Sequence, residues 1–463
     1  MRFQFLIIAL LLSSTALVSQ DKEGMFFVGF ADKADSPFSL DNPQEFLSQR
    51  ALNRRALHQA AITELDLPLS QPYQQAVLAT GAKIWLRSKW MNGVVVQASE
   101  EQLAAIKKLD FVTETEFVAP KQYDRPSRVP VMASLDRPAP TPAKVPVSQR
   151  FYGFGWDNLT GMKGDSLHRW GFRGEGVLVA VLDGGFPNVG YKDFLGYDEE
   201  AAVPGNYDLV QQDSTALDGG THGATVLSTM AAHHPFFYIG TAPGARYVLF
   251  KTENGRGEHR LEEINYAVAL EIADSIGVDV VNSSLGYTEF SDATMNYTKD
   301  DLDGKTSPAS VAIGHAFSRG MIIVTSAGNS GADKWKYIGT PADAPQALSI
   351  GALDPEGERA YFSSVGPTAD GRIKPDVSAL GVSVAAVSAN GRGLDGANGT
   401  SLSSPLVAGL VACLRQAVPD ATNQELLDAI RATASQASSP DNLTGYGQPD
   451  FAAAYRRLMM ARK

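Results

Sequence analysis

Cysteine is almost absent from this 463-residue sequence, which contains only Cys413. A single cysteine cannot form an intramolecular disulfide, so the fold must be stabilised by its apolar core and not by covalent cross-links. The residues around Cys413 are mostly apolar, and this setting predicts a buried structural thiol without a reactive role.

Positive charge and long apolar runs are also scarce. The chain has 40 lysines and arginines against 51 aspartates and glutamates, for a net charge of −11. Binding to nucleic acid requires a basic face, so nucleic acid is excluded as the main partner. Beyond the first twenty residues no run approaches the roughly 20 apolar residues that a membrane-spanning helix needs, and we expect no membrane span.

The first twenty residues differ from the rest. Arg2 is followed by a mostly apolar stretch over residues 3–18, with small residues near its end. This pattern predicts a secretory signal peptide over residues 1–20, since the apolar stretch is too short for a membrane anchor. An uncleaved anchor is the alternative. Export would place the protein in the periplasm, at the cell surface or outside the cell.

Residues 21–122 have the pattern of a small α+β domain. Apolar periodicity predicts strands over residues 25–30, 94–97 and 111–118, and helices over residues 43–60 and 100–109. The basic pair Arg54-Arg55 lies inside the first helix, so we interpret it as part of a solvated helix face and not as a processing site.

A proline-rich stretch follows. Residues 123–150 contain Pro126, Pro130, Pro138, Pro140, Pro142 and Pro146. Proline removes backbone donors and prevents regular pairing, so we predict an extended linker that is open to proteolysis.

Residues 151–463 predict one large α/β domain. Residues 177–182 and 247–250 are continuous apolar runs of the kind found in strands buried on both faces. Helical patterns over 262–276 and 309–319 each lead into a further apolar run, at 278–282 and 321–325, and another follows at 347–350. Repeated helix-to-strand units predict a doubly wound, mainly parallel sheet.

Polar residues that could carry chemistry stand where such sheets bind ligands, at the carboxyl ends of the strands and at helix starts. Asp183 ends the run 177–182 and precedes two glycines, His222 follows Gly219 and Gly220, and Ser401 lies before a predicted helix. Taken singly, each has a simpler interpretation as a turn aspartate, a helix-start histidine or a helix-capping serine.

Together, in the chain order Asp, His, Ser, these segments resemble the signature segments of the subtilisin-like serine peptidases. The segment Val281-Asn282-Ser283-Ser284-Leu285-Gly286 resembles the family's substrate-binding strand. Ser326-Ala327-Gly328-Asn329 resembles its oxyanion segment, and Gly445-Tyr446-Gly447 matches a landmark near the end. The resemblance covers nearly all of residues 174–456.

The resemblance implies a role for each of these positions. Ser401 would be the nucleophile, His222 the general base, Asp183 its orienting partner and Asn329 an oxyanion donor. Substrate binding would involve Ser284, Leu285, Gly286, Ala327, Gly328 and Gly339. Gly339 would form the floor of a primary pocket that accepts large apolar or aromatic side chains, and Asp333, Lys334 and Trp335 in the preceding loop could fold inward and change its rim. Gly184 departs from the family, which usually has Ser or Thr after its Asp.

We therefore expect a secreted serine endopeptidase that hydrolyses polypeptides and is made as a self-processed precursor. Residues 21–122 would be a prosegment that chaperones folding and inhibits the enzyme, the alternative being a retained accessory domain. The rival function is a catalytically silent domain that acts in binding. No cofactor is required for the chemistry. Structural calcium is possible, and the acidic loop Asp300-Asp301-Leu302-Asp303-Gly304 is its candidate site or an ordinary acidic turn.

Overall fold

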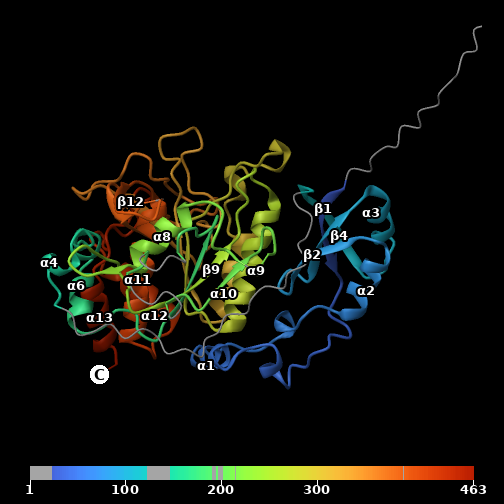
Figure 1. The fold of residues 1–463 in the computed structure, drawn as a ribbon, viewed down its shortest axis with the longest axis horizontal. Helices are drawn as coiled ribbons and strands as arrows, with labels where there is room; N and C mark the ends of the chain where they lie inside the picture. Colours follow the sequence, from blue (N-terminus) through green and yellow to red (C-terminus); the bar gives the residue numbers. More distant parts are fainter. Residues whose placement is uncertain are drawn as a thin grey trace, which may run out of the picture.

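The computed structural model describes residues 23–121, 146–189, 194–196, 202–213, 215–388 and 390–462. The predicted signal peptide and most of the predicted linker lie outside these residues. Figure 1 shows an N-terminal unit (residues 23–121, blue to cyan) packed beside a larger C-terminal unit (residues 146–462).

The N-terminal unit contains a four-stranded antiparallel sheet in the order β2-β3-β1-β4. Its elements are β1 (Gly24–Phe30), α1 (Gln49–Leu57), α2 (Gln71–Ala79), β2 (Lys83–Ser88), β3 (Gly93–Ala98), α3 (Glu100–Ile106) and β4 (Val112–Pro120). Three of the strands and α3 were predicted, whereas β2 and α2 were not. The helix predicted over residues 43–60 is shorter than expected, because its start is fixed by the Ser48 side chain, which accepts a hydrogen bond from the Ala51 amide.

The C-terminal unit is built on seven parallel strands, which confirms the predicted doubly wound sheet. In spatial order they are β13 (Val377–Leu380), β12 (Leu348–Leu353), β11 (Ile322–Ser326), β10 (Val280–Ser283), β5 (Leu178–Asp183), β9 (Arg246–Lys251) and β6 (Gly205–Asp208). Two small hairpins pair β7 (His233–His234) with β8 (Tyr238–Ile239) and β14 (Val384–Val387) with β15 (Leu394–Ala397).

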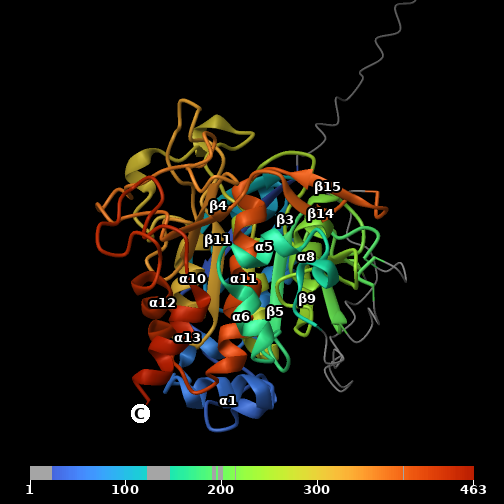
Figure 2. The ribbon, with the colours of Figure 1, turned by 90° about the vertical axis from the view of Figure 1, so that its left-hand side faces the viewer.

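Helices cover both faces of this sheet (Figure 2). They are α4 (Gln149–Tyr152), α5 (Trp156–Thr160), α6 (Gly164–Arg169), α8 (His222–Ala231), α9 (Arg260–Ile276), α10 (Pro308–Ser318), α11 (Thr400–Ala417), α12 (Asn423–Ala432) and α13 (Phe451–Met460).

Strand β5 shows how the sequence specifies these layers. All six of its residues are buried. Val179 and Val181 belong to the core under α8 and α11, whereas Leu178, Ala180 and Leu182 belong to the core under α9 and α10. Successive side chains of a strand point to opposite faces, so a continuous apolar run is what a strand between two helical layers requires.

The N-terminal unit shares the second of these cores. Its apolar side chains pack in one cluster with those of α9 and α10, and the contributing residues are Met25, Phe27, Trp85, Leu86, Trp90, Val95, Val118 and Ala119. The two units are therefore joined by buried apolar surface and not only by the chain between them.

Helix α1 makes a second contact between the two units. This contact shows that the prediction of a solvated helix face for Arg54-Arg55 was wrong. Both side chains are buried, at 6% and 2% exposure. Arg55 pairs with Asp66 and with Asp274 of α9, and Arg54 also pairs with Asp274. The sequence pattern showed a helix but not the acidic partner more than 200 residues away.

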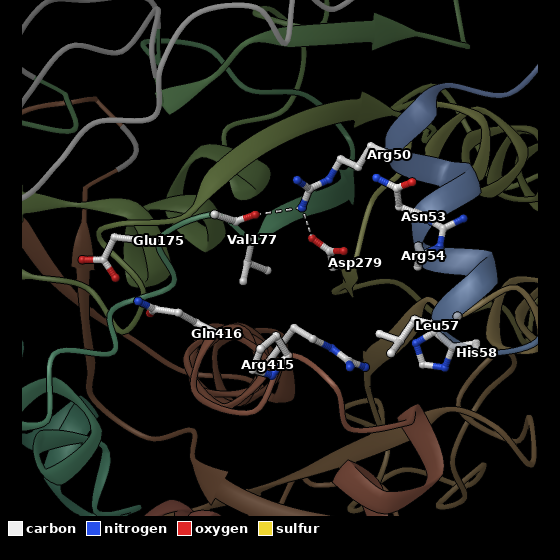
Figure 3. A pocket seen from close by; sticks show the side chains of 13 residues that line it. Arg50, Asn53, Arg54, Leu57, His58, Glu175, Val177, Asp279, Arg415 and Gln416 are labelled. Atoms are coloured by element: carbon white, nitrogen blue, oxygen red, sulfur yellow. Dashed lines mark hydrogen bonds and ion pairs between the residues drawn. The ribbon is translucent and has the colours of Figure 1, made fainter. Parts of the chain in front are cut away.

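Figure 3 shows α1 facing the C-terminal unit across a cavity of about 560 Å³. Arg50 reaches from the helix to Asp279 and to the carbonyl of Gly176. Arg415 and His58 line the same cavity. The helix thus contacts the edge of the unit where the parallel strands begin.

Candidate active site

Asp183 and His222 form a hydrogen-bonded pair. Asp183 ends β5 with 1% exposure, and His222 is the first residue of α8. The Nδ1 atom of His222 lies 2.9 Å and 3.0 Å from the two carboxylate oxygens of Asp183. The Asp183 charge raises the pKa of His222 above its usual value, against the opposing effect of burial. A raised pKa means that the neutral imidazole, the form that accepts a proton, is lost as the pH falls through that pKa.

Glycine allows α8 to start this close to the aspartate. A Cβ atom on Gly223 would lie 2.7 Å from the Asp183 Cβ, which no side chain tolerates. The amide of Gly184 donates to Oδ1 of Asp183 at 2.8 Å. A backbone donor therefore holds the carboxylate at the position where the family's Ser or Thr hydroxyl is missing.

Ser401 lies in the first turn of α11, where backbone N–H groups have no partner within the helix. Pro405, four residues later, has no N–H to donate to the Ser401 carbonyl. That carbonyl instead accepts a hydrogen bond of 2.8 Å from the Ser284 hydroxyl, at the end of β10. Because the proline leaves this carbonyl without a partner in the helix, the candidate nucleophile is hydrogen-bonded to the segment expected to bind substrate.

Asn329 is fixed by the residue before Ser401. Its Oδ1 atom accepts hydrogen bonds of 2.9 Å from both the amide and the hydroxyl of Thr400. Because the oxygen of the side-chain amide is used, its NH₂ group is the side that can donate to a substrate.

Ser401 and Asn329 line a cavity of about 200 Å³ together with all six of the predicted substrate-binding residues, Ser284, Leu285, Gly286, Ala327, Gly328 and Gly339. Trp335, one of the residues expected to be able to fold inward, also lines it, as do Thr288 and Tyr337, which the sequence did not single out. Trp335 folds inward because its indole N–H donates to the carbonyl of Ile338 at 3.1 Å. Asp183 and His222 do not line this cavity, and no hydrogen bond joins His222 to Ser401 in the part of the chain that the structure describes.

A second cavity, of about 380 Å³, lies on the other side of the same strand end and is acidic. It shares Ser284, Leu285 and Gly286 with the first and is also lined by Glu253, Glu258 and Glu262. The carboxylates of the three glutamates lie within 4.8 Å of one another. Burial, together with the neighbouring carboxylates, raises the pKa of all three.

The acidic loop proposed for calcium uses its carboxylates locally. Asp301 accepts the amide of Thr298, and Asp303 accepts the amides of Lys305 and Thr306. Within the described ranges, the glutamate cluster is the one group of three or more His, Cys, Asp or Glu side chains that could hold a metal ion, so the loop does not form a three-carboxylate site. The described part of the chain also has no helix long and apolar enough to cross a membrane.

Comparison with known proteins identifies the two units. Residues 174–447 match the model of the Subtilase family, and residues 25–131 match that of the Peptidase S8 propeptide domain of Bacteroidota. Subtilisin BL and Subtilisin Savinase of Lederbergia lenta are each 31% identical over 299 residues, 64% of this chain and 97% of theirs. Subtilisin E of Bacillus subtilis (strain 168) is 30% identical over 60% of this chain and 65% of its own. The solved structure of MycP1 with its N-terminal propeptide removed has a TM-score of 0.51 at 22% identity, covering 65% of this chain and 96% of that one, and it supports the fold alone.

Proposed function

Because the chain belongs to the subtilase family and is a serine endopeptidase with a propeptide domain, we propose that Asp183, His222 and Ser401 are its catalytic triad and that it acts through an acyl-enzyme. The observation that carries the proposal is the Nδ1–carboxylate pair of His222 and Asp183, at the sheet edge where Ser401 lies in the first turn of a helix. The matches to subtilisins do not favour the catalytically silent alternative.

In the first step Ser401 Oγ attacks the carbonyl carbon of the scissile peptide bond while His222 takes its proton. Asp183 stabilises the imidazolium that forms, and His222 then gives the proton to the leaving amine. Water repeats the sequence in the second step and releases the acid product. Asn329 Nδ2 and the Ser401 amide are the proposed donors to the oxyanion, and loss of one such donor costs about 10²–10³ in kcat.

Polypeptides bind in extended form under this proposal. The backbone of residues 284–286 continues β10, so a substrate can pair with it as an added strand. The cavity beside Ser401 then receives the side chain before the cleaved bond.

We further propose export through the signal peptide over residues 1–20 and self-processing within the linker over residues 123–150. The N-terminal unit, called the prosegment from here on, inhibits the enzyme until it is released. Its match to a propeptide domain supports this role. The accessory-domain alternative predicts instead that it stays covalently attached in the secreted protein.

The test is the Ser401→Ala variant, expressed as the full chain. It should fold, lose hydrolysis of an unfolded protein, fail to react with a fluorophosphonate probe and accumulate with its linker intact. Amino-terminal sequencing of wild-type secreted protein should find a start within residues 123–150. Normal turnover by the variant would refute the triad, whereas a start near residue 20 would refute only the processing.

The proposed chemistry uses no metal. A chelator should therefore leave kcat unchanged in the mature enzyme. A fall in melting temperature on chelation, with kcat intact at lower temperature, would identify calcium as a structural ion.

A further inference from the structure

Lys251 is a buried cation directly beside the triad. It is the last residue of β9 and pairs in register with Asp183 on β5. Only 4% of its side chain is exposed. Its ammonium lies 3.0 Å from Oδ2 of Asp208, at the end of β6, and 2.6 Å from Oδ1 of Asp218. A buried ammonium requires such partners, and here they come from two different segments.

Asp218 belongs to the segment over residues 216–220 that leads into His222, called the approach segment here. Backbone contacts join it to the turn after Asp183. The amide of Gly220 donates to the carbonyl of Gly184 at 3.0 Å, and the amide of Phe186 donates to the carbonyl of Asp218 at 3.1 Å. The positions of the aspartate turn and of the approach segment are therefore coupled.

These backbone contacts orient the start of α8 without help from a side-chain cap. Its N-cap residue, Thr221, makes no side-chain capping hydrogen bond. Two residues before it, Gly219 has a φ of +82°, and a Cβ there would lie 2.7 Å from the Gly184 carbonyl oxygen and 3.1 Å from the Lys251 Cε. The aliphatic part of the Lys251 side chain thus packs against the approach segment, and its ammonium binds Asp218.

We propose that Lys251, acting through Asp218, is a positioning residue that holds the approach segment so that His222 meets the Asp183 carboxylate. This inference rests on the proposed role of His222 as general base. Lys251 touches no reacting atom. Its ion pair fixes the backbone from which His222 projects, and catalysis is sensitive to such placement, because a 1 Å error can cost about 10² in rate.

The experiment compares Asp218→Asn with the matched control Asp208→Asn in the processed enzyme. Asp218 is 46% exposed, so its loss should leave the fold intact. We expect kcat on a short chromogenic peptide to fall roughly 10- to 100-fold with KM nearly unchanged, since the peptide contacts lie on other segments. Asp208→Asn removes the partner that does not contact the approach segment. It should lower the melting temperature and leave kcat within about twofold of wild type.

The acid limb of the pH profile separates positioning from a general loss of stability. The Asp183 charge raises the pKa of His222. If Asp218→Asn moves His222 away from Asp183, this pKa falls, and the acid limb of kcat/KM should move to lower pH. Asp208→Asn should leave the acid limb unchanged. The proton resonance of His222 Nδ1 should shift in Asp218→Asn only.

A double-mutant cycle completes the test. The background carries Asp208→Asn and Lys251→Met, so that both the lysine and the charge of its buried partner are removed. In this background Asp218→Asn should have no further effect on kcat. Equal kcat and equal acid limbs in the two single variants would overturn the inference. Activity in His222→Ala would instead refute the proposed function, so the two failures are distinguishable.

Discussion

At the scale of single residues, the primary pocket makes the most direct prediction of specificity. Thr288, Trp335 and Tyr337, which line the pocket beside the predicted residues, carry no charge, and Gly339 adds no side chain to fill it. The pocket should therefore favour large apolar or aromatic side chains before the cleaved bond, with modest discrimination, since each methylene is worth about 1–3 kcal/mol.

Gly339→Asp tests this assignment. The new Cβ would lie 3.1 Å from the Thr288 methyl, so that side chain must shift by a few tenths of an ångström. The carboxylate would then favour a cation in the pocket. A charged hydrogen bond is worth about 1.5–3 kcal/mol, so kcat/KM for lysine relative to phenylalanine should rise roughly tenfold or more. A peptide library read by mass spectrometry measures the shift, and a wild-type preference for Arg or Gly would contradict the assignment.

The glutamate cluster predicts how stability depends on pH. Burial raises the pKa of Glu253 to about 8 and that of Glu258 to about 7, from an ordinary value of 4.5. Between the ordinary pKa and these values the folded state binds more protons than the unfolded state, so stability falls as the pH rises through that interval.

Glu258→Gln should remove part of this loss. We expect its melting temperature to match wild type near pH 4 and to exceed it increasingly from pH 6 to pH 9. The exposed Glu289→Gln serves as the control and should not change the pH dependence. Scanning calorimetry in the Ser401→Ala background avoids self-digestion. If the melting temperature depended on pH in the same way with and without Glu258→Gln, this would contradict the raised pKa of Glu258.

At the scale of single elements, helix α1 links the prosegment to the catalytic unit through charge. Asp274 is fully buried and accepts both Arg54 and Arg55, while Asp66 is shared between Arg55 and Arg319. Breaking a buried pair by removing one partner costs about 3–5 kcal/mol, because the remaining charge loses its compensation.

Arg55→Met should therefore weaken prosegment retention after linker cleavage. In wild type, activity should appear only some time after the linker is cut, because the cut prosegment stays bound. Arg55→Met should shorten this delay. The control Arg50→Met should change it little, because the Arg50 side chain is 38% exposed and exposed ion pairs contribute little. Gel electrophoresis and peptide hydrolysis followed in one time course measure the delay. An unchanged delay in Arg55→Met would show that α1 is not an anchor.

The same helix shows where sequence reasoning stops. Elements whose signal is local were predicted, such as β5 from its unbroken apolar run and α9 from its 3.6-residue period. Elements and contacts that depend on distant partners were not, such as β6, a strand of four residues, and the burial of Arg55 against Asp274. The substrate-binding residues were assigned because their segments resemble the family's motifs, whereas the inward position of Trp335, which the sequence left open, depends on a hydrogen bond that no motif encodes.

At the scale of the whole molecule, the shared apolar core gives the prosegment a part in folding. Trp85, Leu86 and Trp90 pack in one cluster with the buried faces of α9 and α10. In addition, the buried Glu271 of α9 accepts hydrogen bonds from the Ser88 hydroxyl and from the backbone amides of Lys89 and Trp90. These contacts hold the two helices that cover one face of the parallel sheet.

Parallel sheets fold slowly, because distant strands must meet before their contacts repay the loss of chain entropy. Helices α9 and α10 are the crossovers that place β10 between β5 and β11. A surface that docks both helices before the sheet closes should lower the barrier to folding.

We therefore expect residues 146–463, expressed without the prosegment, to refold from denaturant slowly and in low yield. Adding residues 23–121 in trans should restore the yield, measured as fluorophosphonate-reactive enzyme. The Trp90→Ala prosegment should restore it less well, since loss of a buried tryptophan costs about 3–5 kcal/mol. Rapid, complete refolding of residues 146–463 alone would show that the shared core serves inhibition only.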